Sequence, residues 1–241
     1  MCIRDSHRPL GLPVTQLAER ETELAERTTQ CHPLAVLLDG VAAGRFPPAD
    51  GGVTILSQPS PREAGVLAFT AHSVIFTDVD PAWVRGQLAP GDLSAPVLPA
   101  FLEALCARTG RQANCADMLC VAAARPGSPG IALSPTQAAG HPRVTRALHY
   151  RDNVRTWEVP GGIVTLGRGV AGRWEVAVEV DPDHRGRGLG RDLAAAARHL
   201  VPDGSPLWAQ ITPGNAASVR AFLAAGYRPV GSEVLLRAMT G

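Results

Sequence analysis

The most constraining feature of this chain is a strand-like run that passes through glycines into a helix-forming run. The first part, EVAVEV at residues 175–180, alternates polar and apolar side chains, which predicts a β-strand. The segment DPDHRGRGLG follows at residues 181–190, and residues 189–200 then place Leu or Ala at helical spacing on one face. A helix that begins after such a turn points backbone amides and the positive end of its dipole at one spot. The sequence therefore predicts an α/β chain with an anion-binding site at this turn.

The glycine spacing excludes two common phosphate-binding motifs. The dinucleotide fingerprint GxGxxG fails in both registers, because Arg191 or Leu193 stands where its third glycine is required. A Walker A loop needs a lysine, and the chain has none among its 23 basic residues. The pattern that remains is RxxGxG, from Arg185 to Gly190, in which glycines let the backbone approach a ligand and an arginine adds charge.

Two motifs in the last hundred residues resemble the GNAT N-acetyltransferase superfamily. RGRGLG after EVAVEVDP resembles the loop with which that family binds the pyrophosphate of acetyl-CoA, and GNAASVRAFLAAGYRPVG resembles its second conserved helix. Together they cover about residues 150–240. The resemblance implies the α/β (α+β) GNAT fold, a mixed, mostly antiparallel sheet flanked by helices, here with an N-terminal extension. It also implies acetyl-CoA as co-substrate. No metal is expected, because His72, His141 and His149 lack the spacing of metal ligands.

The resemblance assigns roles to named positions. Backbone amides of residues 185–190 would hold the pyrophosphate, and the edge of the preceding strand would pair with the pantetheine arm. An amide near Val178 or Val180 would hold the oxyanion. Asn215 would bond the same arm, cap the helix that follows it, or do both. The expected acetyl-CoA-binding residues are Val178, Val180, Arg185, Gly186, Arg187, Gly188, Leu189, Gly190 and Asn215.

Glu175 and Glu179 are the candidate catalytic residues, as bases that take the proton of an attacking amine. Strand alternation places both on one face, opposite the apolar side chains. The alternative is that both are solvated glutamates on an exposed face. The family's usual general acid is a tyrosine seven residues after the asparagine, and that position here is Phe222, which has no proton to donate.

The expected function is transfer of acetyl from acetyl-CoA to the amine of a small molecule or peptide. The alternative, which Phe222 favours, is a catalytically weak or inactive acetyl-CoA-binding sensor or interaction module. The near balance of 23 basic and 22 acidic residues argues against nucleic acid as a partner. No apolar run of about 18 residues and no cleavable leader is present, which predicts a cytoplasmic protein without a membrane partner.

Local patterns predict further elements. Helices are expected at residues 14–27, 81–88, 96–110 and 215–226, and strands at 34–38, 52–57, 117–124 and 206–212. Residues 66–79 read as strands and turns, residues 156–180 as a three-stranded meander, and residues 227–238 as a final hairpin. The five cysteines contain no CxxC pair, which argues against a disulfide framework or a structural zinc site.

Three parts of the chain are expected. Residues 1–64 are an N-terminal extension whose first six residues, MCIRDS, resemble translated adapter sequence. Residues 65–140 are the acceptor-side part of the fold with a linker, and residues 141–241 are the acetyl-CoA-binding core. The alternative is a tandem arrangement with a decayed N-terminal copy, because DVDPAWVRGQL at residues 78–88 echoes EVDPDHRGRGL at residues 179–189.

Overall fold

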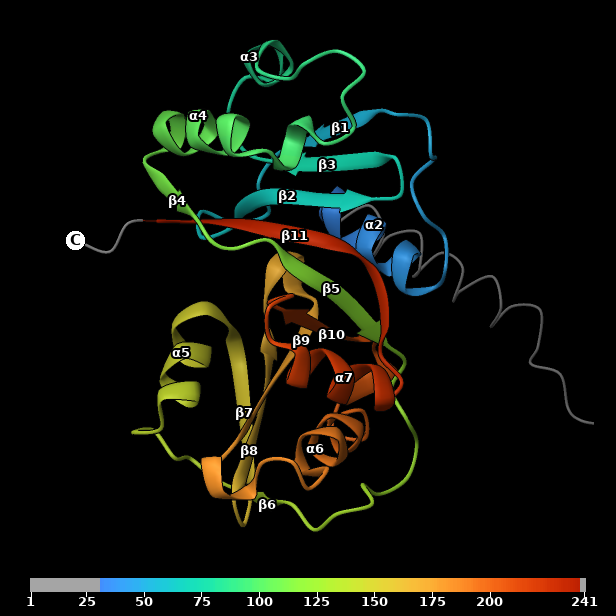
Figure 1. The fold of residues 1–241 in the computed structure, drawn as a ribbon, viewed down its shortest axis with the longest axis vertical. Coiled ribbons are helices and arrows are strands. Elements are labelled where there is room, and N and C mark those ends of the chain that lie inside the picture. The colour runs from blue at the N-terminus through green and yellow to red at the C-terminus, as the bar shows by residue number, and fades with distance from the viewer. Residues whose placement is uncertain (1–30, 239–241) are drawn as a thin grey trace, which may run out of the picture. The chain divides into compact units, whose positions relative to one another are not determined.

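Eleven strands form one mixed sheet in residues 31–238, the part of the chain that the computed structural model describes (Figure 1). The predicted helix at residues 14–27 lies outside the described residues. The strand order is β1-β3-β2-β11-β5-β10-β9-β8-β7-β6, and β4 also pairs with β11. The strands are β1 (Val53–Leu56), β2 (Ala64–Phe69), β3 (His72–Phe76), β4 (Arg111–Ala113), β5 (Asp117–Ala122), β6 (Ser134–Pro135), β7 (Asp152–Val159), β8 (Gly162–Arg168), β9 (Trp174–Val180), β10 (Leu207–Ile211) and β11 (Arg228–Ala238).

Only β1 with β3 and β9 with β10 pair in parallel within the described sheet, so the prediction of a mostly antiparallel sheet is confirmed. The helices that flank it are α2 (Pro33–Ala42), α3 (Pro81–Gly86), α4 (Pro99–Thr109), α5 (Pro142–Tyr150), α6 (Leu189–Ala197) and α7 (Ala216–Ala224). No described helix is long and apolar enough to cross a membrane.

Three apolar clusters join the helices to the sheet. The first lies between β8 to β10 and the helices α6 and α7, around Leu166, Leu193 and Phe222. The second joins α2 to one face of β2 and β3, and the third joins α3 and α4 to residues of β2, β3 and β11. Figure 1 shows α5 beside β7, away from α6 and α7. The part of the sheet that contains β8 and β9 is therefore covered on both faces.

The strands β9 and β10 run together only at their beginnings. In the described sheet, Trp174 and Glu175 of β9 face Leu207 and Trp208 of β10, and no later pair follows. On its other side β9 pairs with β8 along its whole length, from Trp174 to Val180. The C-terminal half of β9 therefore has one edge that β10 does not cover.

The structure corrects two local predictions and adds one helix that was not predicted. Residues 34–38 are not a strand but part of α2, in which Leu34, Leu38 and Val41 are buried on one helical face. Residues 227–238 are not a hairpin, because β11 is one strand whose register shifts between Pro229 and Gly231. The helix α5, which no sequence pattern predicted, stands directly before the β7–β9 meander.

Candidate functional site

The glycine loop has the backbone that an anion site requires. Gly186 and Gly188 both lie in the left-handed region, with φ of 75° and 86°, and Gly188 is the N-cap of α6. The first helical hydrogen bond of α6 runs from the Asp192 N–H to the Gly188 carbonyl, so the amides before it have no acceptor within the helix. Arg185, Gly186 and Arg187 are exposed. The loop is therefore open to a ligand from solvent.

The uncovered edge of β9 presents the two predicted amides. The Asp181 N–H donates to the Gly161 carbonyl on the β8 side at 2.9 Å. Because backbone groups alternate in direction along a strand, the N–H groups of Val178 and Val180 point to the opposite edge, where β10 has diverged. The Val180 carbonyl on this edge accepts a bond from Arg185 Nε at 3.1 Å. This hydrogen bond connects the uncovered edge of β9 to the glycine loop.

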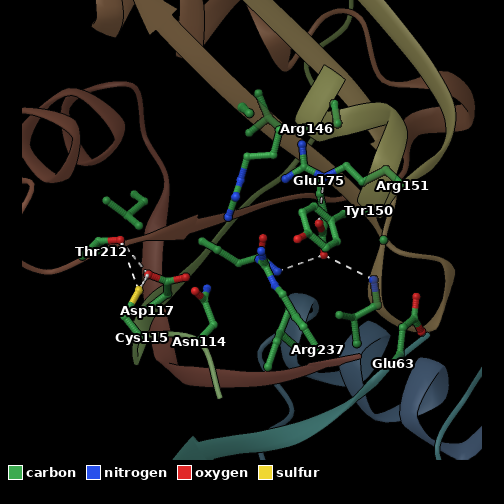
Figure 2. Close-up of a pocket in the computed structure, with 18 of the residues that line it drawn as sticks. Glu63, Asn114, Cys115, Asp117, Arg146, Tyr150, Arg151, Glu175, Thr212 and Arg237 are labelled. Carbon is green, nitrogen blue, oxygen red and sulfur yellow. Dashed lines mark hydrogen bonds and ion pairs between the residues drawn. The ribbon is translucent and has the colours of Figure 1, made fainter. Parts of the chain in front are cut away.

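A pocket of about 330 Å³ lies where β9 and β10 separate (Figure 2). Of the predicted site residues, Glu175, Val178 and Asn215 line it, together with Phe222. Glu179, Val180 and the loop from Arg185 to Gly190 lie outside it. Its other charged lining residues come from α5 and from strand ends that are distant in sequence: Arg62, Glu63, Asp117, Arg143, Arg146, Arg151 and Arg237.

Glu175 is not a free carboxylate. It is 4% exposed, Arg151 Nε contacts its Oε2 at 3.0 Å, and Arg173 Nε contacts its Oε1 at 2.9 Å. Burial opposes its charge, but the guanidiniums of Arg173 and Arg151 outweigh burial and hold the pKa of Glu175 below its usual range. Gln210 joins Glu175 to the buried Glu233, which also accepts two bonds of 2.8 Å from Arg173. Glu175 therefore belongs to a buried ionic network.

Glu179 lies on the same face of β9 as Glu175, as the alternation predicted, while Trp174, Val176, Val178 and Val180 pack in the apolar cluster opposite. It is not simply solvated, because Arg143 Nε contacts its Oε2 at 3.0 Å and the side chain is 35% exposed. Both glutamates thus pair with arginines of the segment formed by α5 and the residue after it. This helix was missed, so neither pair was foreseen.

Asn215 caps α7, and the aromatic residues Phe222 and Tyr227, within and just after this helix, are buried. The Asn215 Oδ1 accepts the Ser218 N–H at 3.1 Å, which caps α7. Phe222 is buried beside Tyr227, with ring centroids 4.9 Å apart. Tyr227 is 2% exposed and donates its hydroxyl to the Ala194 carbonyl, and burial raises its pKa. Of the chain's two tyrosines, Tyr150 of α5 is the one that lines the pocket.

Sequence reasoning also missed an acidic group at the pocket wall. The Oδ1 of Asp117 accepts a bond from the Thr212 hydroxyl at 2.9 Å and one from the Cys115 thiol at 3.2 Å. Within residues 31–238, no arginine or histidine forms an ion pair with this carboxylate. Among the same residues, no group of three or more His, Cys, Asp or Glu side chains is placed to hold a metal ion. Asp117 is therefore the pocket carboxylate that remains free of a cationic partner.

Comparison with known proteins bears on the segment that carries the site. Residues 174–235 match the model of the FR47-like protein family. This family is related to GNAT, so the resemblance predicted for the C-terminal part of the chain is confirmed. The match begins at β9 and ends within β11, and it includes the glycine loop, α6, β10 and α7. A comparison with curated proteins finds no match.

Two solved structures are similar to parts of the chain. A GCN5-related N-acetyltransferase from Kribbella flavida is 18% identical over 58% of this chain and 64% of its own, with a TM-score of 0.39. The chain thus spans less than two thirds of that protein. A protein from Novosphingobium aromaticivorans, described as an acetyltransferase from the GNAT family, is 18% identical over 55% of this chain and 69% of its own, with a TM-score of 0.37. Both TM-scores lie below 0.5.

Proposed function

We propose that this chain, whose residues 174–235 match a GNAT-related family, is an N-acetyltransferase that moves acetyl from acetyl-CoA to an amine. One observation carries the proposal above others. The edge of β9 that β10 leaves uncovered leads directly into a loop with two glycines at positive φ and then into the N-terminus of α6. A strand edge suits an extended amide-bearing arm, and a helix N-terminus suits a pyrophosphate.

The residues present fit acetyl-CoA in this way. The backbone from Arg185 to Gly190, exposed at its first three residues, would hold the pyrophosphate, and the amides of Val178 and Val180 would pair with the pantetheine arm or polarise the thioester carbonyl. A Cβ built on Gly190 would make ordinary contacts with the side chains of Val180 and Ala221, at 3.6 Å and 3.8 Å, so the first turn of α6 lies close to β9 and α7. Asn215 caps α7 and lines the same pocket.

Proton transfer needs a carboxylate that the amine is able to reach. Glu175 is held by two arginines, and Glu179 is paired with Arg143 outside the pocket lining. We therefore assign the proton-accepting role to Asp117, and to Glu175 the role of positioning residue. In the reaction a C–N bond forms to the amine, the amine proton passes to the base, and the C–S bond of the thioester breaks, so that CoA leaves as a thiolate that takes up a proton from water.

The experiment that tests the proposal is calorimetric titration of acetyl-CoA, with desulfo-CoA and ATP as comparison ligands. Gly188→Val should lower acetyl-CoA affinity at least about tenfold, because a branched side chain at φ of 86° distorts the loop. Gly127→Val is the matched control, since Gly127 also has a positive φ, of 81°, but lies in the loop between β5 and β6. Equal affinity in both variants would contradict the proposal.

A second function has one observation in its favour. Phe222 lines the pocket at the position where the family commonly has a tyrosine, so the chain is also suited to bind acetyl-CoA without efficient turnover. Such a sensor would bind acetyl-CoA in the titration and release no CoA thiol with any amine. An active protein whose turnover is unchanged by Phe222→Tyr would show that the missing phenol is not limiting.

A further inference from the structure

The arginines of the pocket fall into two groups. Arg62, Arg143 and Arg151 each form an ion pair, with Asp152, Glu179 and Glu175 respectively. Arg146 and Arg237 also line the pocket, and within residues 31–238 neither forms an ion pair with a carboxylate. The positive charge of these two side chains is therefore not neutralised by the described protein.

Arg146 and Arg237 are held together by one aromatic ring. The Arg237 guanidinium carbon lies 4.0 Å and the Arg146 guanidinium carbon 5.2 Å from the ring centroid of Tyr150. The Nε of Arg237 is buried and has no hydrogen-bond partner. Burial and the neighbouring charges of Arg237, Tyr150, Arg143 and Arg151 act on Arg146, with the net effect that its pKa is lowered. The guanidiniums of Arg146 and Arg237 thus lie on the same aromatic ring, and no carboxylate of the described residues pairs with either.

The free carboxylate of the pocket lies elsewhere. Figure 2 shows Asp117, Cys115 and Thr212 gathered on one side of the pocket, and Tyr150 with Arg146 and Arg151 on the other. The pocket therefore presents an uncompensated negative group and uncompensated positive groups at separate places on its wall. A molecule with an ammonium or amine at one end and an anion at the other would complement both.

We infer that the acceptor of the proposed acetyl transfer is an amine that also carries an anionic group, a carboxylate or a phosphate, bound by Arg146 and Arg237 on the Tyr150 ring. This inference rests on the proposed function and names the substrate class of the same site. Guanidinium forks match the paired oxygens of a carboxylate or phosphate. The amine would then lie toward Asp117.

The test compares matched acceptors in pairs that differ in the anion. Amino acids are paired with their amides, and phosphoethanolamine is paired with ethanolamine, so that carboxylate and phosphate are distinguished. CoA release gives turnover, and calorimetry with the CoA-saturated protein gives affinity for the same compounds when turnover is slow. We expect the anionic member of at least one type of pair to be preferred by about 10- to 100-fold, the range for a charged hydrogen bond.

Variants locate the preference. Arg146→Gln and Arg237→Gln should each raise the KM or Kd of the anionic acceptor about tenfold or more, leave that of its neutral partner nearly unchanged, and leave acetyl-CoA affinity intact. Arg108→Gln is the matched control, because Arg108 is an exposed arginine that also stacks on an aromatic ring, that of Trp83, but lies outside the pocket. Retained acetyl-CoA affinity shows that a variant is folded.

The outcomes separate the two proposals. Absence of acetyl-CoA binding by the unaltered protein overturns the proposed function. Acetyl-CoA binding with equal use of charged and neutral acceptors, or with no binding of any panel member, overturns the acceptor assignment alone. An anionic preference that survives in both pocket variants also overturns it, because the anion would then be bound elsewhere.

Discussion

At the scale of single residues, the buried ionic network around Glu175 is sensitive to the loss of any one member. Arg173 and Glu233 are both nearly inaccessible, and together with Glu175 and Gln210 they join β9, β10 and β11. Arg173 also lies over the Trp208 ring, at 5.2 Å. Removing one member of such a group leaves the others buried without compensation. The network thus ties the strand that borders the pocket to the centre of the sheet.

Glu175→Gln should therefore destabilise the protein by about 3–5 kcal/mol, measured by urea unfolding. Glu158→Gln is the control, because Glu158 is an exposed carboxylate of β7. Its effect should stay within about 0.5 kcal/mol. Similar small losses in both variants would show that Glu175 contributes little to the network.

The effect of Glu175→Gln on stability should also depend on pH. The pKa of Glu175 is lowered in the folded protein, so its charge contributes stability above the pKa of the unfolded chain, about 4.3. That contribution is lost as the pH falls through the lower, folded pKa. The difference in stability between the unaltered protein and Glu175→Gln should therefore shrink below about pH 4. Thermal unfolding of both proteins at a series of pH values measures this difference. A difference that is constant down to pH 2 would contradict this account.

Only those features of the site that depend on local spacing in the sequence were predictable. The loop from Arg185 to Gly190 and the alternation of Glu175 and Glu179 are local patterns, and the structure places both as the patterns imply. The pocket arginines are different, because Arg146 and Arg237 are 91 positions apart and meet only through Tyr150. No spacing rule relates side chains that are brought together by tertiary packing.

At the scale of elements, the turn between β7 and β8 supports the glycine loop. Gly161 has φ of 81°, and a Cβ built on it would lie 2.1 Å from the ring of His184, in the short helix Pro182–His184 that precedes the loop. His184 therefore packs on the backbone of Gly161. This packing explains why a histidine stands at this position.

Gly161→Ala should cost at least about 1–2 kcal/mol from the left-handed backbone alone, and the clash with His184 should add to this and weaken acetyl-CoA binding. In the double variant with His184→Ala, the clash is removed and part of the loss should be recovered. Stability from thermal unfolding and affinity from calorimetry check both effects. Strictly additive losses would show that the two residues do not interact.

Elements were predicted well where one periodicity dominates. The meander β7 to β9 was expected from three strand-like runs and α4 from helical spacing, and both were confirmed; α4 ends at Gly110, whose φ is 64°. The α2 error arose because LAVLL is a short apolar run, which suits a buried strand or a helix equally. The helix α5 has buried residues only at Val144 and Ala147, and its arginines contact the glutamates of β9, so its sequence alone reads as polar loop. The β11 error arose because the glycine at position 231 marks a register shift against β5 and a close approach to the Ala68 carbonyl of β2, and not a turn.

At the scale of the whole molecule, the strand order places strands from the first and second halves of the described chain side by side in one sheet. β5 lies between β10 and β11 and is antiparallel to both, although it precedes them by more than 80 residues. Residues 141–241, the part proposed to bind acetyl-CoA, therefore share their central sheet with a strand from residues 65–140. The pocket likewise draws residues from both parts.

A fragment of residues 141–241 should consequently fail to fold alone, because β10 and β11 would both expose edges that β5 covers in the full chain. We expect aggregation or a non-cooperative thermal transition, and recovery of acetyl-CoA binding when residues 31–140 are co-expressed as a separate chain. A fragment that unfolds cooperatively and binds acetyl-CoA would contradict this prediction.

The position of β11 also constrains when the protein is able to fold during its synthesis. β11 is the last of the described strands to leave the ribosome, yet it pairs with β2, β4 and β5, which leave it much earlier. Until then β2 and β5 each present a bare edge to other nascent chains. Their exposure lasts for the translation of more than 100 residues, from the end of β5 to the start of β11. Efficient expression of this protein should therefore depend on chaperones that shield strand edges and on the rate at which its last strand is translated.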